Sequence, residues 1–527
     1  MLAFLVRALS LILCGFTLLE VNYPRLTPHA QLAIFAALGL VIGFLTVPAR
    51  KSWRKENPGR ALDWLLAALT VLVCGFVVTQ TEPAFERWWL TGQSLGNRAG
   101  FETTADVIVG TVGLLLVLEA ARRTIGAALP VLSVLFLAYA YWGSALPDWL
   151  FPHRGYSIER IVAQAFLQAQ GVFGVALSVM FSYVFLFVIL GALLELTGAT
   201  EFIIDFATRT FRRSAGGPAK VGVVSAGLMG TLSGSAVANT ATCGTFTIPL
   251  MRSAGFRPDT AAGVQAAASS GGALMPPVMG AAAYMMLEIV DPPVTYLEII
   301  RAALLPALLY YLSLLLYVHF YARRSMMARG DLAVPAAAAG SAARRIEGTI
   351  FFGALAVLLL LLAVGYTPFR AVTVSLVVIA ALSFLSARTR ISWSGLQTAL
   401  VKSSRDAVPL IAASACVGII IGIVTLTGIG TRFPAALLPL AEESLLLALV
   451  IIMASSIVLG MGLPSTVCYL LLATLIGPVL GQLGVIPLAA HLFIFYFGMM
   501  SMVTPLVALA AYAAATIAQA PVLGASM

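Results

Sequence analysis

The sequence predicts an all-α protein that crosses a membrane many times, and three observations predict it. The 527-residue chain is 60% hydrophobic and only 10% charged, whereas a soluble domain carries about 25% charged residues. Apolar stretches of about 20 residues, the length that crosses a bilayer, recur along the whole chain. Glycines and prolines interrupt matching apolar segments in two halves of the chain, which is typical of transporters built from inverted repeats.

The first part of the chain carries four predicted spans and two basic loops. The spans are expected at residues 2–20, 31–49, 61–80 and 105–121. We interpret the first as a retained span, because Arg7 lies inside it and no small-residue cleavage site follows. The basic loops, at 50–60 and at Arg122 and Arg123, are separated by two spans. Both can therefore lie in the cytoplasm, with the N-terminus also cytoplasmic.

The remaining chain divides into two comparable halves. We expect four regions: a four-span leading region at 1–125, a first repeat at 126–321, a cytoplasmic linker at 322–347 and a second repeat at 348–527. The first repeat has predicted spans at 127–146 and 172–198, a broken span at 260–287 and a span at 298–320. The second has predicted spans at 349–365, 369–386, 407–427 and 444–459 and a broken span at 489–517. The span at 298–320 should have a counterpart near 527–549, where the chain stops. We therefore expect that the second repeat dispenses with its last helix or that the chain is shortened at its C-terminus, and we favour shortening.

A recurring spacing of helix-breaking residues supports the two repeats. Residues that break helices recur 229 positions apart: Pro249, Gly255, Pro258 and Pro276 return as Pro478, Gly484, Pro487 and Pro505. In the first repeat, basic loops flank the Gly/Ser-rich segment 231–242. In the second repeat, Glu442, Glu443 and the uncharged segment 481–486 flank the corresponding segment 460–466. Because basic loops stay in the cytoplasm, equivalent loops face opposite sides of the membrane. The repeat is therefore expected to be inverted.

The segment 231–242, TLSGSAVANTAT, is the first candidate binding segment. We expect it to join two apolar arms of about ten residues, each rising about 15 Å, or half a bilayer. Such arms can form a re-entrant hairpin with its tip near the midplane. Serine hydroxyls, the Asn239 side chain and free backbone carbonyls at the tip are hard oxygen donors that suit Na⁺. The alternative is a tight helix contact made by small residues.

The segment 268–277, ASSGGALMPP, is the second candidate. It cannot remain one helix, because two prolines lack amide donors and push the preceding residues out of the helical conformation. The break frees carbonyls that can bind a cation and amides that can bind a carboxylate. A simple proline kink is the alternative, although it needs only one proline and no preceding Ser-Ser-Gly-Gly.

The second half supplies equivalents with fewer polar side chains. The segment 460–466, GMGLPST, is the expected opposing hairpin tip, and 501–505, SMVTP, is the expected second break. A second cation site would therefore depend more on backbone carbonyls. We interpret His491, one turn into the second broken span, as a buried structural histidine, with a proton-coupling role as the alternative.

Other function classes find little support in the sequence. The net charge of +9 is accounted for by basic cytoplasmic loops, and no basic stripe interleaved with aromatic residues predicts nucleic-acid binding. No Cys-x-x-Cys pair, His-Glu metal motif or Asp-rich cluster is present. A membrane-embedded enzyme would need such groups at one depth, so we expect a protein that is not an enzyme.

Several blocks of sequence are long enough to compare with a known family. They read GGPAKV from Gly216, SGSAVAN from Ser233, GTFTIPL from Gly244, AAASSGG from Ala266, MPPVMGAAA from Met275, GMGLPST from Gly460 and PLAAHLF from Pro487. Together they closely resemble the fused membrane subunit of TRAP (tripartite ATP-independent periplasmic) transporters, and the TAXI branch in particular. The resemblance covers roughly residues 126–517. The four leading spans look like the small subunit fused to the large one.

The resemblance implies Na⁺-coupled uptake of an organic acid across the bacterial inner membrane. A periplasmic binding protein would deliver the substrate, and a hairpin-bearing transport domain would move as an elevator. The implied Na⁺ ligands are Ser233, Ser235, Asn239, Ser270 and Gly272 at one site, and Gly460, Gly462, Thr466, Ser501 and Thr504 at a second. The implied substrate contacts are Ser235, Asn239, Pro276, Ser465, Thr466 and Pro505. A stand-alone Na⁺/carboxylate symporter is the alternative within the transporter class.

The second break departs from the family pattern. That pattern often reads Asp-x-Thr-Pro-Pro, whereas this chain has Met502 in place of the acid and Leu506 in place of the second proline. The departure puts the second cation site in doubt.

Overall fold

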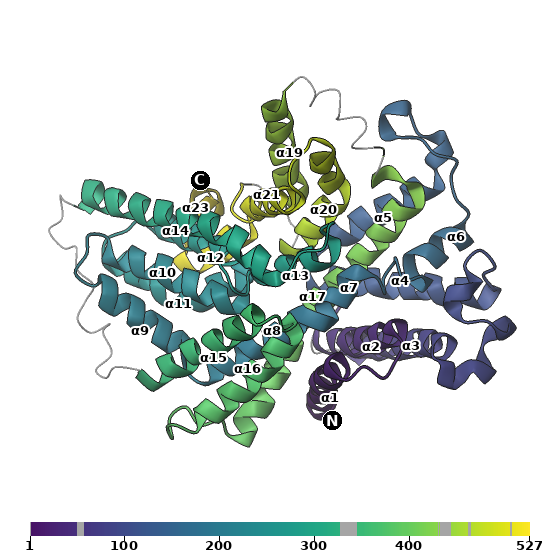
Figure 1. Ribbon diagram of the computed structural model, residues 1–527, viewed down its shortest axis with the longest axis horizontal. Helices are drawn as coiled ribbons and strands as arrows, with labels where there is room; N and C mark the ends of the chain where they lie inside the picture. The colour runs from purple at the N-terminus through teal and green to yellow at the C-terminus, as the bar shows by residue number, and fades with distance from the viewer. Residues whose placement is uncertain are drawn as a thin grey trace. The chain divides into compact units, whose positions relative to one another are not determined.

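The fold of the chain is helical throughout its described part. The computed structural model describes residues 2–49, 57–326, 345–430, 432, 444–461, 465–505 and 508–526. Every regular element in these ranges is a helix (Figure 1). Eight of the helices are long and apolar enough to cross a membrane. The prediction of an all-α protein is confirmed for the described residues, and the eight apolar helices are consistent with a protein that crosses a membrane many times.

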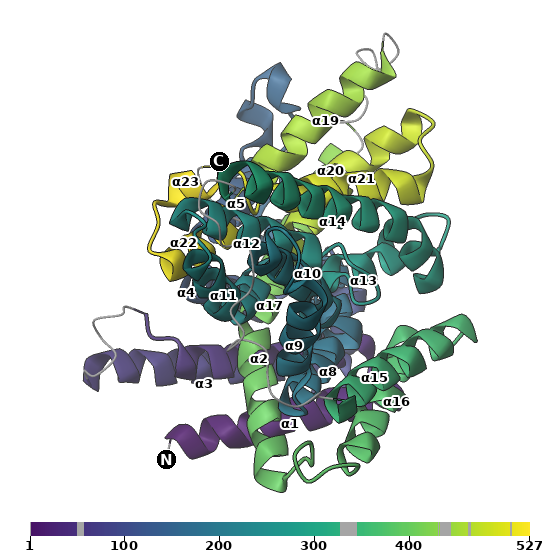
Figure 2. The same ribbon diagram turned by 90° about the vertical axis from the view of Figure 1, so that its left-hand side faces the viewer.

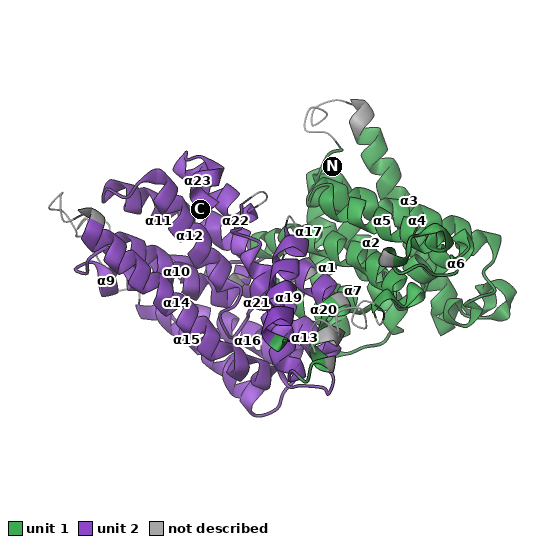
Figure 3. Cartoon of the chain, turned by 90° about the horizontal axis from the view of Figure 1, so that it is seen from above, with its two compact units in different colours: residues 1–189, 397–445, 473–484 green, residues 190–396, 446–472, 485–527 purple. Residues whose placement is uncertain are grey.

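The helices group into two compact units (Figure 3). Unit 1 holds residues 1–189, 397–445 and 473–484, and unit 2 holds residues 190–396, 446–472 and 485–527. Each unit combines segments from both predicted halves of the chain. The predicted domain boundaries stay a prediction.

Unit 1 contains the leading spans and the long helix α17. Its helices are α1 (Leu2–Asn22), α2 (Pro28–Thr46), α3 (Asn57–Thr81), α4 (Thr104–Thr124), α5 (Ala128–Tyr141), α6 (Ile158–Val162), α7 (Val175–Val179) and most of α17 (Trp393–Thr427). Short 3₁₀ helices η2 (Pro83–Trp88), η3 (Leu90–Gly92), η4 (Leu95–Arg98), η5 (Gly143–Ala145) and η6 (Asp148–Leu150) lie in its loops. Single π-helical turns are η7 (Ala163–Leu167) and η8 (Met180–Val184), which leads into α8 (Phe185–Leu196). Each of the four predicted leading spans coincides with a helix that is long and apolar enough to cross a membrane.

Apolar packing and, among the described residues, a buried ion pair between Arg98 and Asp106 hold unit 1 together. Helix α2 packs along α3 and α1, and α4 packs against α3. The loop between α3 and α4 is closed by Arg98, whose guanidinium lies 2.8 Å from an Asp106 carboxylate oxygen with both side chains buried. The same guanidinium donates to Gln80 and to the Leu90 carbonyl, each at 2.9 Å. A buried charge needs such partners, so this loop has a defined conformation.

Unit 2 contains both predicted broken spans. Its helices are α9 (Ala199–Phe211), α10 (Gly217–Ser233), α11 (Ala236–Ser253), α12 (Pro258–Gly272), α13 (Gly280–Ile289), α14 (Tyr296–Met326), α15 (Arg345–Ala363), α16 (Pro368–Ser383), α19 (Leu445–Gly460), the start of α20 (Ser465–Gln482), α21 (Pro487–Met500), α22 (Leu509–Ala518) and α23 (Val522–Ser526). Helices α10, α11, α12 and α22 pack together as its centre (Figure 2). Both expected breaks are confirmed: α12 ends at Gly272 and α13 begins at Gly280, and α21 ends at Met500 and α22 begins at Leu509.

Two expectations about helix lengths are wrong, and one helix was not expected. The span expected at 127–146 is the 14-residue α5, because the chain turns into a 3₁₀ helix at Gly143. The span expected at 407–427 begins at Trp393, since the charged side chains of Lys402, Arg405 and Asp406 lie exposed on a continuous helix. The unexpected helix is α9, which contains Arg209, the first of the basic residues that precede α10.

Some predicted loops fall partly or wholly on residues outside the described ranges. They are the basic loop at 50–56, the linker residues 327–344 and the acidic pair Glu442 and Glu443. The described parts of the linker extend α14 to Met326 and begin α15 at Arg345.

Candidate ion and substrate site

Helices α10 and α11 form the first predicted hairpin. Helix α10 ends at Ser233, and Gly234 turns the chain with a left-handed φ of 56°. Ser235 then caps α11, its hydroxyl accepting from the Ala238 amide at 3.4 Å. The arms have 17 and 18 residues, so the expected ten-residue length is wrong. Each arm rises about 26 Å, because its small residues stay helical when packed against α12. Arm length does not make the hairpin re-entrant, and that interpretation stays a prediction.

The break between α12 and α13 forms where Gly-Gly and Pro-Pro were expected to produce it. After Gly272 the chain makes tight turns, in which the Ala273, Leu274 and Met275 amides donate to carbonyls three residues earlier. Met279 and Gly280 adopt left-handed φ values of 54° and 66°. Helix α13 then begins at Gly280, leaving its first-turn amides without helical partners.

The hairpin tip and the break meet through glycine backbones. A Cβ atom at Gly230 would lie 2.2 Å from Gly272 Cα, and one at Gly234 would lie 2.3 Å from Gly280 Cα. No side chain fits in either place, since carbon atoms in contact lie about 3.5–4.0 Å apart. These glycines allow α10 to approach both α12 and the start of α13.

Two buried oxygens at this junction lack hydrogen-bond partners among the described residues. Asn239 is 1% exposed, and its Nδ2 donates to the Ala226 carbonyl at 2.7 Å. That donation fixes the amide orientation, leaving Oδ1 unpaired. Ser270, which is 3% exposed, also has an unpaired hydroxyl. A Cβ at Gly272 would lie 2.6 Å from Asn239 Nδ2, so Asn239 lies directly beside the break. A buried oxygen without a protein partner can accept from a water molecule or bind a cation.

The second half repeats the contact in a different chemical form. A Cβ at Gly460 would lie 2.8 Å from Ser501 Oγ, and this pair corresponds to Gly230 and Gly272 at offsets of 230 and 229. The Ser501 hydroxyl lies 2.9 Å from the Gly460 carbonyl and donates its hydrogen either there or to Gly498. Thr504 donates to the Met500 carbonyl at 2.7 Å. These hydroxyls already have partners, unlike the Ser270 hydroxyl of the first site.

The structure brings some predicted residues together and leaves others untested. Helix α21, which precedes the second break, contacts both α12 and α13. For Ser233, Ser465 and Thr466 only the helical backbone is described, and Gly462 and Leu506 lie outside the described residues. Pro276 and Pro505 are partly exposed, each within its break. Convergence of the two hairpin tips on one substrate stays a prediction.

Sequence reasoning missed the tyrosines of α14. The Tyr296 hydroxyl lies 2.6 Å from the Pro277 carbonyl, and the Tyr310 and Tyr311 hydroxyls donate to α12 carbonyls at 2.8 and 2.7 Å. Tyr296 begins α14, and tyrosines near span ends normally lie at the membrane interface. Tyr310 and Tyr311 lie in the middle of the helix, where no local pattern distinguished them. His491, expected to be buried, is 7% exposed and pairs with the Tyr469 hydroxyl at 2.8 Å.

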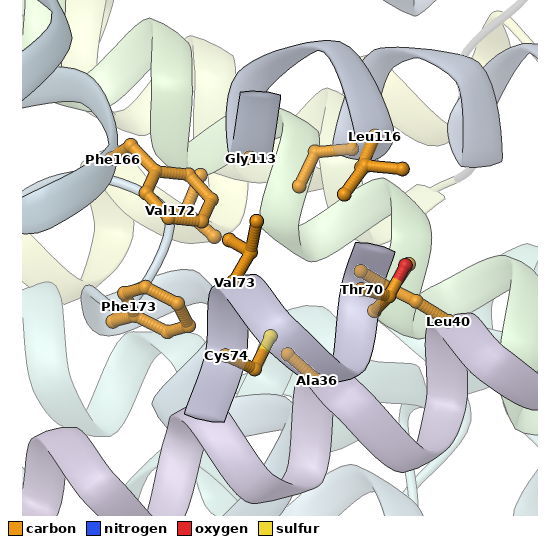
Figure 4. Close-up of a pocket in the computed structure, with 11 residues that line it drawn as sticks. Ala36, Leu40, Thr70, Val73, Cys74, Gly113, Leu116, Phe166, Val172 and Phe173 are labelled. Carbon is orange, nitrogen blue, oxygen red and sulfur yellow. The ribbon is translucent and has the colours of Figure 1, made fainter. Parts of the chain in front are cut away.

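A small cavity lies elsewhere, among α2, α3, α4 and η7 of unit 1 (Figure 4). Apolar side chains such as Leu40, Val73 and Phe166 line it, and Thr70 contributes a hydroxyl that bonds within its own helix. Its volume of about 10 Å³ admits one water at most. We therefore interpret it as a packing gap and not as a binding site.

Comparisons with known proteins agree with this geometry. Residues 112–527, well over half of the chain, match the family model described as "Tripartite ATP-independent periplasmic transporter, DctM component". One stretch of 81 residues is 38% identical to the "2,3-diketo-L-gulonate TRAP transporter large permease protein YiaN" of Escherichia coli (strain K12). That stretch is 15% of this chain and spans about a fifth (19%) of the relative.

The matched family consists of transport permeases and is not a class of enzymes. Its members normally work with a periplasmic binding protein and a small membrane subunit. The matched region contains the hairpin α10–α11 and both helix breaks. The chain belongs to the DctM family of large permease subunits of tripartite ATP-independent periplasmic transporters.

Proposed function

We propose that this permease couples uptake of an organic acid to Na⁺ entry across the bacterial inner membrane. Membership of the family implies substrate uptake through a TRAP system. The coupling to Na⁺, the organic-acid substrate and the location in the inner membrane are our proposal. So are assignment to the TAXI branch, a periplasmic binding protein as donor and elevator motion of the hairpin-bearing helices.

The single observation that carries the proposal is the pair of unpaired buried oxygens, Asn239 Oδ1 and Ser270 Oγ. Both are neutral hard donors, which suit an alkali cation better than a soft metal. They lie on α11 and α12, where the hairpin tip meets the break. A cation bound there would join these two helices and supply the missing partners.

The same junction offers a place for an anion. Helix α13 begins at Gly280, and the amides of its first turn have no helical acceptors. A helix N-terminus of this kind attracts a carboxylate through its amides and its dipole. A cation beside it would favour the same carboxylate, so ion binding and substrate binding would reinforce each other.

The leading helices fit the role of a fused small subunit. Four apolar helices, α1 to α4, precede or overlap the start of the matched region at residue 112. The basic residues Arg122 and Arg123 follow two spans after the loop at 50–60, which supports a cytoplasmic N-terminus. A subunit fused in this way would leave the binding protein as the remaining separate component.

The proposal is tested first on the purified protein, without knowing the substrate. Binding of Na⁺ to the folded state raises the melting temperature by mass action. We expect NaCl to stabilise the protein more than choline chloride does. Asn239→Ala and Ser270→Ala should raise the half-saturating Na⁺ concentration by about 10-fold or more, since a bond to a charged group contributes about 1.5–3 kcal/mol.

Ser253→Ala is the matched control. Ser253 is an exposed serine at the end of α11, and its hydroxyl donates within the same helix. Proteoliposome uptake of labelled organic acids, with and without a binding protein, then separates the two transporter hypotheses. Uptake driven as well by K⁺ or protons would contradict the Na⁺ proposal, and uptake without a binding protein would favour a stand-alone symporter.

A further inference from the structure

Tyr296, the first residue of α14, reaches back to the break between α12 and α13. Its hydroxyl lies 2.6 Å from the Pro277 carbonyl and 3.0 Å from the Val278 carbonyl. The side chain is 3% exposed, and its ring stacks on Tyr284 of α13 at a centroid distance of 4.8 Å and an angle of 17°. A side chain from the next helix therefore holds the backbone of the break.

The backbone amides of the break donate to other carbonyls: those of Ala273, Leu274, Met275 and Met279 donate to the carbonyls of residues 270, 271, 272 and 275. Pro276 and Pro277 have no N–H group, so two of the nearest donors are absent. Buried carbonyls need a partner, and leaving one without a donor is costly. The Tyr296 hydroxyl is the donor that the structure places there, shared between two acceptors.

Two further tyrosines of α14 hold the other side of the break. The Tyr310 hydroxyl donates to the Ala267 carbonyl, and the Tyr311 hydroxyl donates to the Ala268 carbonyl. Both carbonyls lie within one helical turn before Ser270, the residue with the unpaired hydroxyl. The Tyr310 ring also packs on Gly271, where a Cβ would lie 2.2 Å from the ring. Helix α14 thus contacts the chain on both sides of the break.

We propose that Tyr296 is a positioning residue for the coupling ion, an inference that rests on the Na⁺ site proposed above. It acts through the backbone, by fixing the carbonyls of Pro277 and Val278 so that Ser270 stays aligned with Asn239. Without the hydroxyl, these carbonyls turn toward other donors and the break relaxes. The ion then binds a site whose oxygens are no longer held at the required separation. The affinity for Na⁺ falls, while the maximal rate of transport is retained.

Tyr296→Phe is the test, and Tyr317→Phe is the matched control. Tyr317 lies on the same helix with 57% of its surface exposed, and the described residues give its hydroxyl no hydrogen bond. The readouts are Na⁺-dependent stabilisation of the purified full chain, against choline, and Na⁺-dependent uptake in proteoliposomes with the binding protein. For Tyr296→Phe we expect the half-saturating Na⁺ concentration to rise about 3- to 10-fold, the size of one lost hydrogen bond. The maximal rate at saturating Na⁺ should stay within about 2-fold, and Tyr317→Phe should match the wild type.

Each outcome decides between the proposals. A Na⁺ response of Tyr296→Phe within 2-fold of wild type overturns the positioning role and leaves the proposed function standing. A wild-type protein that does not respond to Na⁺ overturns both. A lower maximal rate with unchanged Na⁺ half-saturation also overturns the positioning role, since a merely structural defect acts that way. If Tyr296→Phe does not fold, Tyr310→Phe is judged by the same criterion.

Discussion

Gly272→Ala places a methyl group in the contact on which the proposed ion site depends. The new Cβ would lie 2.6 Å from Asn239 Nδ2, 2.9 Å from Gly230 Cα and 3.1 Å from the Ala226 carbonyl oxygen. Ordinary contacts of this kind are about 3.5–4.0 Å. Helices α10 and α12 must therefore separate by about 1 Å, or Asn239 must leave its position.

The energetic cost follows from these two responses. Overpacking of a well-packed interior costs about 1–3 kcal/mol. Displacing Asn239 removes its 2.7 Å bond to Ala226, worth about 1 kcal/mol. We expect the two together to destabilise the protein by about 2–4 kcal/mol. Because Asn239 carries a proposed Na⁺ ligand, Na⁺ affinity should fall at least about 10-fold.

The assay is thermal unfolding of the purified protein over a series of NaCl concentrations, at constant ionic strength with choline chloride. Gly75→Ala in α3 is the control, because a Cβ there would meet no atom within 4 Å. In a helix that control should be neutral or slightly stabilising. A Gly272→Ala protein with the melting temperature and Na⁺ response of the wild type would refute the close approach of α10 and α12.

Three further predictions concern unit 1. Asp106→Asn leaves the guanidinium of Arg98 buried without its carboxylate, and should lower the melting temperature by an amount equivalent to about 3–5 kcal/mol. Gly422→Ala places a Cβ 2.9 Å from the Gln164 carbonyl, so thermal unfolding should reveal a loss of about 1–3 kcal/mol. Burial lowers the pKa of His153 below its ordinary value, so the unfolded chain binds the proton more readily. The stability that His153 contributes should therefore be fully present above about pH 6.5 and be lost as the pH falls from there toward the pKa of the folded protein. Melting temperatures measured between pH 8 and pH 5 should depend less on pH in His153→Gln than in the wild type.

The helix breaks were predictable because their causes are local. Pro276 and Pro277 lack amide donors wherever they occur, so a broken span was expected from those residues alone. The repeat was visible for the same reason, since prolines and glycines return at one offset. Helix lengths were less predictable: the arms of α10 and α11 consist of small residues with little preference of their own. Their extent depends on packing, which a search for apolar stretches does not see.

The candidate site was likewise predictable from the sequence only in part. Asn239 was identified from residue type and position, and Ser270 as a ligand through the family resemblance, but the lack of partners for their oxygens is a property of the folded chain. Tyr296 was not identified, because its acceptors lie 18 and 19 residues earlier and no local rule joins them. The sequence alone shows that Met502 departs from the family pattern. Only the structure shows that the Ser501 hydroxyl lies within hydrogen-bonding distance of the Gly460 carbonyl, at the end of α19.

By itself, the sequence determined the class of the protein, its many spans and the places where helices must break. These follow from the hydrophobicity and backbone chemistry of neighbouring residues. Only the tertiary structure decided which glycine backbones touch, which buried oxygens stay unpaired and which tyrosines hold the first break. Those features arise from residues far apart along the chain, and packing alone brings such residues within hydrogen-bonding distance.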